Sequence, residues 1–119
     1  MRGVAKGLWQ YWNSFDIPAY PETAVPDDAS LPYITYDIVS PNWSGEAFFP
    51  ARVWYEDTSF DAITKKVDEI SEDIGEGKRI VIDGGFMFLF KEDNFAKIEQ
   101  MDEDGVKCAY LQMTLHALA

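Results

Sequence analysis

Two side chains are suited to nucleophilic catalysis, a single cysteine, Cys108, and a single histidine, His116. A thiol nucleophile needs a base within hydrogen-bonding distance. Residues 107–117 alternate apolar and polar side chains, which predicts one long strand with Cys108 and His116 on the same face. Eight residues of strand, at about 3.3 Å each, separate the two side chains by far more than a hydrogen bond. The pattern therefore excludes a dyad within that strand and favours structural roles for both residues.

The sequence contains no pattern that indicates a metal or cofactor site. Histidine and cysteine do not occur in pairs at the spacing of a metal site. The acidic run at 101–105 would need an acidic calcium ligand where Met113 stands, so it is interpreted as a charged turn. Twenty-one carboxylates do not by themselves indicate acid–base catalysis. We therefore expect no metal, no cofactor and no enzymatic activity.

The glycine pair Gly84-Gly85 follows a short apolar run, as a phosphate-binding loop would. It lacks the further glycines and the lysine of such a loop, and a second apolar run follows it in place of a helix. Because paired glycines accept the positive φ of a tight turn, the pattern predicts a β-hairpin between 79–83 and 86–91.

The charge of the chain restricts its partners. Ten Lys and Arg against 21 Asp and Glu give a net charge of −11, which argues against binding nucleic acid through phosphate neutralisation. Two interpretations of the acidic surface remain open: a solvated face that keeps the protein soluble, or the lining of a ring that repels DNA passing through it. The same alternatives apply to the acidic residues crowded at 68–73 in a predicted helix.

The length of 119 residues predicts one domain, 1–119, with a single core. One cysteine permits no internal disulfide, so folding in the cytosol fits best. We see no secretion signal at 1–12 and no apolar run long enough to span a bilayer, and we therefore expect no membrane partner.

Apolar spacing predicts two helices. In 4–15, apolar side chains recur at spacings of four, four and three, and in 58–75 they recur at three, four, three and four. Thr58 or Ser59 is suited to cap the start of the second helix, and Gly75 to end it.

Alternating side chains predict strands at 33–38 and 49–55, paired as an antiparallel hairpin, in addition to the two short strands and the long closing strand. Residues 94–101 fit either a helical turn or a strand with a bulge. The proline-rich segment 17–36 is interpreted as an ordered, extended tether between the first helix and the first strand, because each proline restricts itself and the residue before it.

Trp43, Phe48 and Phe49 are the predicted subunit-interface residues. They fall in the expected loop between the first two strands, and an exposed apolar loop is a candidate contact surface. The alternative is that these side chains fold back over the core.

The order of these elements, with AYPETAVPDDASLPYITY at 19–36 and VWYEDTSFDAITKKVDEI at 53–70, resembles the small tail terminator or tail completion proteins of long-tailed phages and prophages. These are often described as minor capsid or head-tail joining proteins. The resemblance implies an α+β fold, in which two helices pack on one side of a mixed, mainly antiparallel sheet.

The resemblance also implies a function. Such a protein is a structural virion protein, assembled in the host cytoplasm, that forms a hexameric ring on the tail tube. The ring ends tube polymerisation and joins the tail to a head-completion or connector protein, and DNA passes through it only as cargo. The alternative is a small acidic binding or adaptor domain outside a virion, similar to an immunity protein or a regulator, because acidic surfaces suit basic partners.

Overall fold

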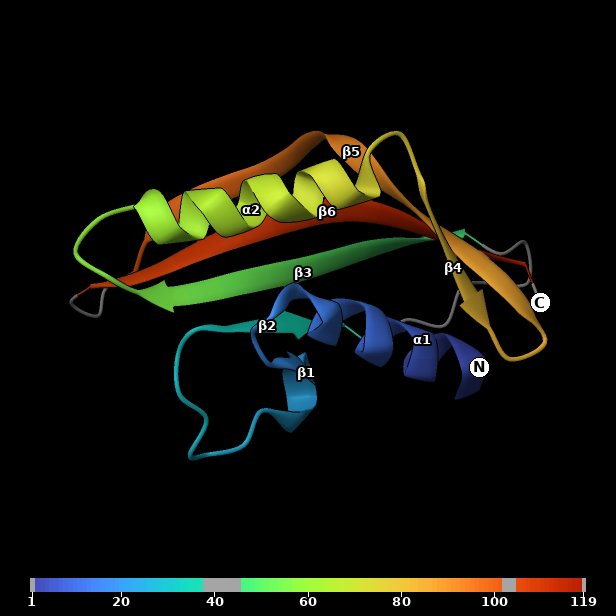
Figure 1. Ribbon diagram of the computed structural model, residues 1–119, viewed down its shortest axis with the longest axis horizontal. Coiled ribbons are helices and arrows are strands. Elements are labelled where there is room, and N and C mark those ends of the chain that lie inside the picture. Colours follow the sequence, from blue (N-terminus) through green and yellow to red (C-terminus); the bar gives the residue numbers. More distant parts are fainter. Residues whose placement is uncertain (1, 38–45, 102–104, 119) are drawn as a thin grey trace.

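The computed structural model describes residues 2–37, 46–101 and 105–118. The helices and strands are, in chain order, α1 (Arg2–Trp12), β1 (Ala19–Pro21), β2 (Tyr33–Tyr36), β3 (Glu46–Glu56), α2 (Asp61–Ile74), β4 (Lys78–Ile82), β5 (Gly85–Gln100) and β6 (Val106–Leu118). The strands form one curled, six-stranded sheet in the order β1-β2-β3-β6-β5-β4 (Figure 1). Among the strands in the described ranges, only β1 and β2 pair in parallel. The predicted α+β class, with a mixed, mainly antiparallel sheet in a single domain, is confirmed.

The long central strands have the predicted alternation. In β6, Ala109, Leu111, Met113 and Leu115 are buried in the core, whereas the residues between them lie on the other face of the sheet and are partly exposed. The antiparallel β2–β3 pairing, with Tyr33 opposite Trp54, confirms the first predicted hairpin. Gly84 has a φ of 84° in the turn between β4 and β5, which confirms the second hairpin.

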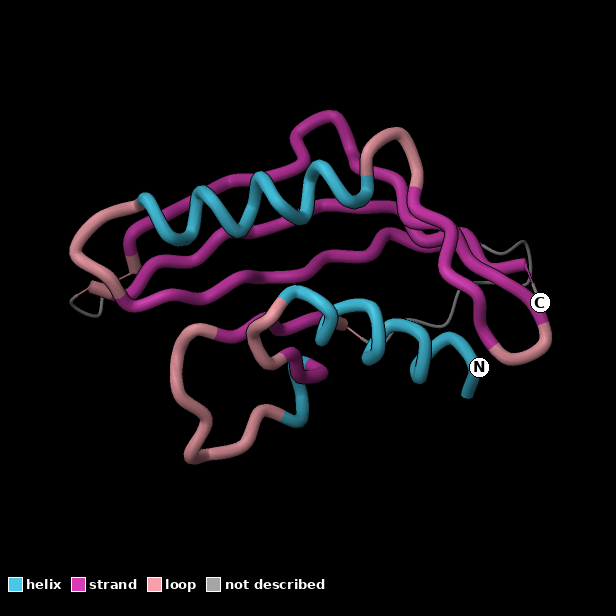
Figure 2. The backbone as a smooth tube through the Cα atoms, viewed as in Figure 1, coloured by secondary structure: helices cyan, strands magenta, loops and turns pink. Residues whose placement is uncertain are grey.

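Strand β5 resolves the alternative left open at 94–101. Residues 94–100 continue β5, and a bulge between Lys91 and Ala96 interrupts its pairing with β6. The bulge is visible as a fold in β5 (Figure 2). The bulge changes which side chains face the core, from the odd-numbered Met87 and Leu89 to the even-numbered Ile98. The strand with a bulge is therefore the correct alternative.

Helix α1 buries the predicted stripe of Val4, Leu8 and Trp12, and Phe15 completes it in the 3₁₀ turn that follows. The helix runs beside the β4–β5 hairpin, and Gly7 lies at the contact. A Cβ atom added at Gly7 would lie 2.6 Å from Cγ2 of Ile82. This distance is shorter than real Cβ contacts, so the absence of a side chain allows α1 to approach the sheet.

We expect Gly7→Val to lower the free energy of unfolding by about 1–3 kcal/mol, because the new side chain would overpack the contact with Ile82. The measurement is urea unfolding followed by circular dichroism. Lys6→Val, at the exposed neighbouring position, is the matched control, because it introduces the same side chain into the same helix. If the two variants were equally stable, close packing at Gly7 would not be important.

Helix α2 buries Ile63, Val67, Ile70 and Ile74, and it ends as predicted at Gly75, where φ is 55°. Its start differs from the prediction. The first helical residue is Asp61, and the N-cap position belongs to Phe60, whose side chain is exposed and cannot cap. Ser59 still accepts a hydrogen bond from the Asp61 backbone N–H, at 3.2 Å, from just outside the helix.

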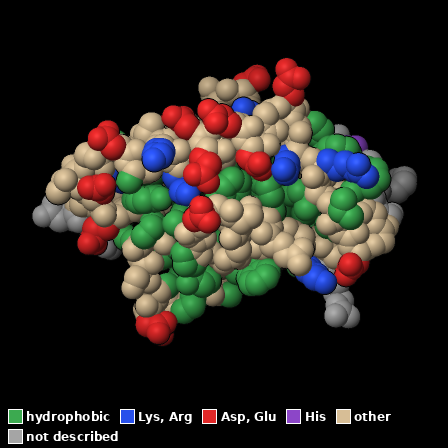
Figure 3. Space-filling model, in the orientation of Figure 1, with side chains coloured by type: hydrophobic (Ala, Val, Ile, Leu, Met, Phe, Trp, Pro, Cys, Tyr) green, Lys and Arg blue, Asp and Glu red, His purple; other side chains and the backbone are tan. Residues whose placement is uncertain are grey.

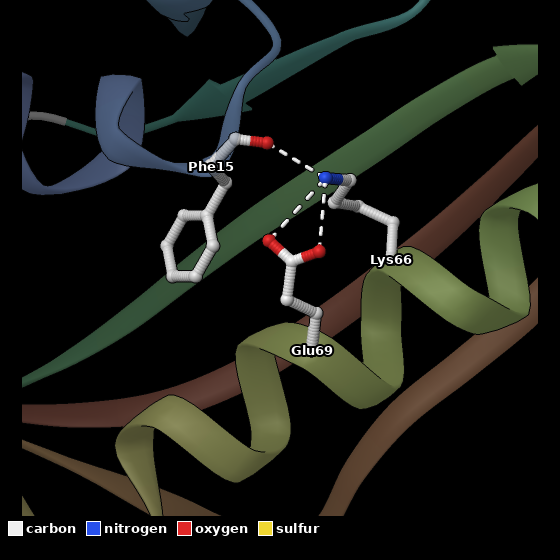
Figure 4. A network of polar contacts seen from close by, with 3 residues as sticks. All are labelled: Phe15, Lys66 and Glu69. Atoms are coloured by element: carbon white, nitrogen blue, oxygen red, sulfur yellow. Dashed lines mark hydrogen bonds and ion pairs between the residues drawn. The ribbon is translucent and has the colours of Figure 1, made fainter.

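The two helices are linked by polar contacts. Nζ of Lys66 donates to the backbone oxygen of Phe15 at 2.7 Å and pairs with Glu69 at 3.2 Å (Figure 4). The Tyr11 hydroxyl donates to Asp73 at 2.8 Å, and burial and this carboxylate raise the tyrosine pKa. The helices contact different strands of the curled sheet: α2 lies on β3, β5 and β6, whereas α1 contacts β4 and β1. The expectation that both pack on one side is therefore not clearly met.

The segment 17–36 differs from its prediction. It is ordered, and a strand begins at Tyr33 as expected, but it is not an extended tether. Strand β1 pairs in parallel with β2, with Ala19 opposite Ile34, so the segment folds back on itself. The Asn13 side chain donates to the backbone oxygen of Trp9 and accepts from the Ala19 N–H, and these bonds hold the start of the loop. The backbone stays extended at the prolines for which it is described, with ψ of 141° at Pro21 and 123° at Val25 before Pro26, and the segment reverses direction between β1 and β2.

Candidate functional site: the open face of the sheet

The sheet has a second face, opposite the core, that no described helix covers; we call it the open face. Its side chains alternate with the core side chains along β3, β5 and β6, and most are partly or largely exposed, whereas Val106 and Cys108 are buried. A sheet face of this kind is normally polar. Here a substantial part is aromatic, and this makes it the candidate functional site.

An apolar patch occupies one end of the open face, and it consists of Phe48, Val81, Phe86, Phe88 and Phe90. The three phenylalanines of β5 form a row with ring centroids 5.6 and 5.9 Å apart. Phe90 lies opposite Thr114 of β6, which in turn lies opposite Phe48 of β3. The exposed fraction is 51% for Phe48 and 71% for Val81. Contiguous exposed apolar surface on a small protein indicates an interaction site.

Arg79 adds a positive charge to this patch. It lies opposite Phe88 across the β4–β5 pair, and its guanidinium carbon is 4.8 Å from the centre of the Phe86 ring. A guanidinium over an aromatic face is favourably placed and remains available for a carboxylate. Arg79 makes no ion pair with any residue that the structure describes.

A shallow hollow of about 280 Å³ occupies the other end of the open face. Arg52 lies over the Tyr110 ring at 4.9 Å and pairs with Glu22. The indole N–H of Trp54 donates to the Thr35 hydroxyl at 3.0 Å. The hollow is lined by Arg52, Trp54, Lys97, Glu99, Met101, Cys108 and Tyr110. Both of its cations already pair with carboxylates, Arg52 with Glu22 and Lys97 with Glu99 at 2.8 Å, so the hollow offers aromatic walls without a free positive charge.

Cys108 lies at this hollow, but its thiol is unsuited to nucleophilic chemistry. Burial raises its pKa from the ordinary 9.0 to about 11, and the thiolate is the reactive form. Cys108 and His116 lie on the same face of β6, as predicted, with His116 paired across to Phe88. Cys108 is a free, buried cysteine, which agrees with the structural role that the sequence favours for it.

This raised pKa predicts a loss of stability in alkali. The folded state keeps the Cys108 proton up to about pH 11, whereas the unfolded state loses it near pH 9. The stabilisation is therefore complete below about pH 9 and is lost as the pH rises through 11. Between pH 8 and 11, the wild type should lose about 2 kcal/mol more than Cys108→Ala in urea unfolding. Equal losses of unfolding free energy in the wild type and in Cys108→Ala would show that titration of Cys108 does not cause the effect.

The structure supports the interface prediction differently for each of the three residues. Phe48 and Phe49 lie in β3, not in a loop. Phe49 is 0% exposed and packs against Trp12 and Tyr36, so its assignment to a subunit interface is corrected: it is a core residue. Phe48 points to the open face, where its interface role stays a prediction. Trp43 and the acidic turn at 102–104 lie outside the described residues.

The outer side of α2 is acidic, in contrast to the apolar patch on the open face. Asp68 and Glu72 on α2 and Glu76 just after it are exposed, and none forms an ion pair with a described residue. We call these three residues the acidic ridge. Acidic side chains gather over α2 in the space-filling view (Figure 3). Asp73 differs from them, because it pairs with Lys78 at 3.5 Å in addition to Tyr11.

Within 2–37, 46–101 and 105–118, no cluster of His, Cys, Asp or Glu is arranged to hold a metal ion. No described helix is long and apolar enough to cross a membrane. Comparison of the chain with protein-family models, with curated proteins and with solved structures finds no match.

Proposed function

We propose that this protein is a structural component of a phage tail, which forms a ring on the tail tube, ends tube polymerisation and joins the tail to the head. The observation that carries the proposal is the apolar patch on the open face. A domain of this size rarely leaves so many neighbouring phenylalanines on a sheet surface unless another protein covers them. Self-association through this face is the simplest way to bury them.

The distribution of charge supports the same proposal. The chain has a net charge of −11, yet the five residues of the apolar patch lie beside Arg79, and Glu92, which accepts a hydrogen bond from Thr114 between Phe90 and Phe48, is the carboxylate that the described contacts place there. Copies of an acidic protein repel each other over most of their surfaces. Contact through the apolar patch therefore has the smallest electrostatic repulsion to overcome. The remaining acidic surface suits a ring through which DNA passes without binding.

The partners in this proposal are other copies of the chain, the tail tube protein and a head-completion protein. The observed α+β class with a mixed sheet is the one that the resemblance implies, apart from the placement of both helices on one side, and it supports the proposal in this respect. Light scattering should find an oligomer at micromolar to millimolar protein concentration. A mass equal to one 13.6 kDa chain throughout that range, also with tube protein added, would contradict the proposal.

The acidic ridge favours a second candidate, an adaptor domain that binds a basic partner outside a virion. The genes that flank the coding sequence separate the two. Portal, capsid and tail-tube genes support the ring protein, whereas a gene for a basic toxin supports the adaptor.

A further inference from the structure

Strand β5 has an unpaired edge beyond the apolar patch. Strand β4 pairs only with 85–89 of β5, and no other strand in the described ranges lies on that side of it. Regular pairing with β6 resumes at Ala96, after the bulge. Figure 2 shows this last part of β5 at the margin of the molecule, with no strand beyond it. We call residues 96–99 the β5 edge.

The backbone groups of the β5 edge point alternately toward β6 and away from it. The Met101 N–H donates to the Val106 oxygen at 2.8 Å, and in an antiparallel pair every second residue bonds to the partner strand. The odd-numbered residues of the β5 edge therefore face β6. The N–H and C=O groups of Ala96 and Ile98 point outward, where no described strand receives them. A row of this kind is able to pair with one more strand.

The side of α2 that faces this edge is acidic. Nζ of Lys91 on β5 donates to the Ser71 hydroxyl at 2.9 Å, so the Ser71 side of α2 lies toward β5. Asp68 precedes Ser71 by three residues and therefore lies on the same side, and Glu72 follows it in the helix. Asp93 is exposed in the bulge. None of these three carboxylates forms an ion pair with a described residue.

The region around the β5 edge has more negative than positive side chains. Its carboxylates are Asp68, Glu72, Glu92, Asp93 and Glu99, and its lysines are Lys65, Lys91 and Lys97. Lys97 already pairs with Glu99 at 2.8 Å. Pairing of two copies along this edge would bring two acidic sets together, and like charges disfavour such a contact. A basic segment of another protein avoids this repulsion.

We propose that the β5 edge binds an extended, basic segment of another protein, which adds a seventh strand to the six-stranded sheet. The segment forms main-chain hydrogen bonds with Ala96 and Ile98 and places lysine or arginine side chains beside Asp68 and Glu72. This inference goes beyond the proposed ring contact and does not depend on it, because the open face remains available.

The first test is amide hydrogen exchange, measured by NMR with and without the peptide acetyl-Thr-Lys-Val-Lys-Val-Lys-Thr-amide. In the protein alone, the amides of Ala96 and Ile98 should exchange rapidly, whereas those of Lys97 and Glu99 should exchange slowly because they bond to β6. Bound peptide should slow exchange at Ala96 and Ile98. The same peptide with glutamate in place of each lysine should leave exchange at both positions unchanged.

Two methylated peptides test the strand geometry without altering the protein. One carries N-methyl groups on its three lysine residues, and the other carries them on the residues between the lysines. A strand turns alternate amides toward its neighbour, so one peptide loses its hydrogen bonds to β5 and the other keeps them. One of the two should therefore bind at least about tenfold more weakly than the parent peptide in calorimetric titration, and the other should bind like it.

The double variant Asp68→Lys/Glu72→Lys tests the charged part of the site. It should weaken binding of the parent peptide at least about tenfold, because lysines of the peptide would then face lysines of α2. Asp27→Lys/Asp28→Lys is the matched control, since it changes the net charge equally at exposed positions outside this region. The control should bind the peptide like the wild type, and circular dichroism verifies that both variants are folded.

Three results would overturn the proposal. Equal binding of the two methylated peptides, or binding of neither, would show that the peptide does not pair as a strand. Unchanged exchange at Ala96 and Ile98 at saturating peptide would place the binding elsewhere. Protection of these amides that rises with protein concentration, without peptide, would identify a second copy as the occupant. Self-association through the open face is measured separately, so failure here would leave the proposed function intact.

Discussion

Replacing Trp12 with alanine is expected to lower the free energy of unfolding by about 3–5 kcal/mol, a large part of the total for a domain of this size. The side chain is 0% exposed, and its ring lies 6.0 Å from that of Phe15 and 6.2 Å from that of Phe49. It therefore joins α1 to the central strand β3, and removing it would leave a cavity between helix and sheet. Urea unfolding followed by circular dichroism measures the loss.

Two variants distinguish this cavity from other effects of substitution. Trp12→Phe keeps most of the ring and removes an indole N–H that has no hydrogen-bond partner among the described residues, so it should cost much less than Trp12→Ala. Trp9→Ala removes a side chain that is 52% exposed on the same helix and should change stability by less than about 1 kcal/mol. A Trp12→Ala midpoint close to that of the wild type would show that α1 is not anchored through this residue.

Phe48→Asp is expected to abolish self-association without unfolding the protein. The substitution puts a carboxylate into the apolar patch of every copy, and truncation of a central aromatic contact commonly costs 2 kcal/mol or more of binding free energy. The dissociation constant should therefore rise by at least about thirtyfold. The melting temperature should fall by only a few degrees, because the side chain is half exposed on the open face.

Trp9→Asp is the matched control for Phe48→Asp. Both substitutions replace an aromatic side chain with aspartate, and the two side chains have nearly equal exposed fractions, 52% and 51%. Only Phe48 lies on the open face. Equal loss of assembly in both variants would indicate a general effect of added negative charge. It would contradict the assignment of the open face as the interface between copies.

The regular elements could be predicted because their side chains have a clear period. The stripe of Val4, Leu8 and Trp12 and the alternation along 107–117 both correspond to buried faces in the structure. The fold of segment 17–36 could not be predicted in the same way. A three-residue parallel pairing has no period of its own, and the bonds of the Asn13 side chain that hold the loop depend on residues brought together by folding.

Only part of the candidate site could be predicted from the sequence. The alternation in the sequence predicts a strand only from residue 49, which leaves Phe48 and Phe49 at the edge of the expected loop. The strand begins earlier, at Glu46, and its alternation sends Phe49 to the core and Phe48 to the open face. The run FMFLF at 86–90 contained the stronger signal. Its buried face is occupied by Met87 and Leu89, so the alternating phenylalanines had to lie on the opposite face.

The most direct test of the ring proposal is negative-stain imaging of the purified protein over a range of concentrations. The account predicts closed rings of uniform size with a central opening, and it predicts that Phe48→Asp removes them while Trp9→Asp leaves them intact. Fields that contain only single domains at every concentration, with and without tail tube protein, would contradict the central claim.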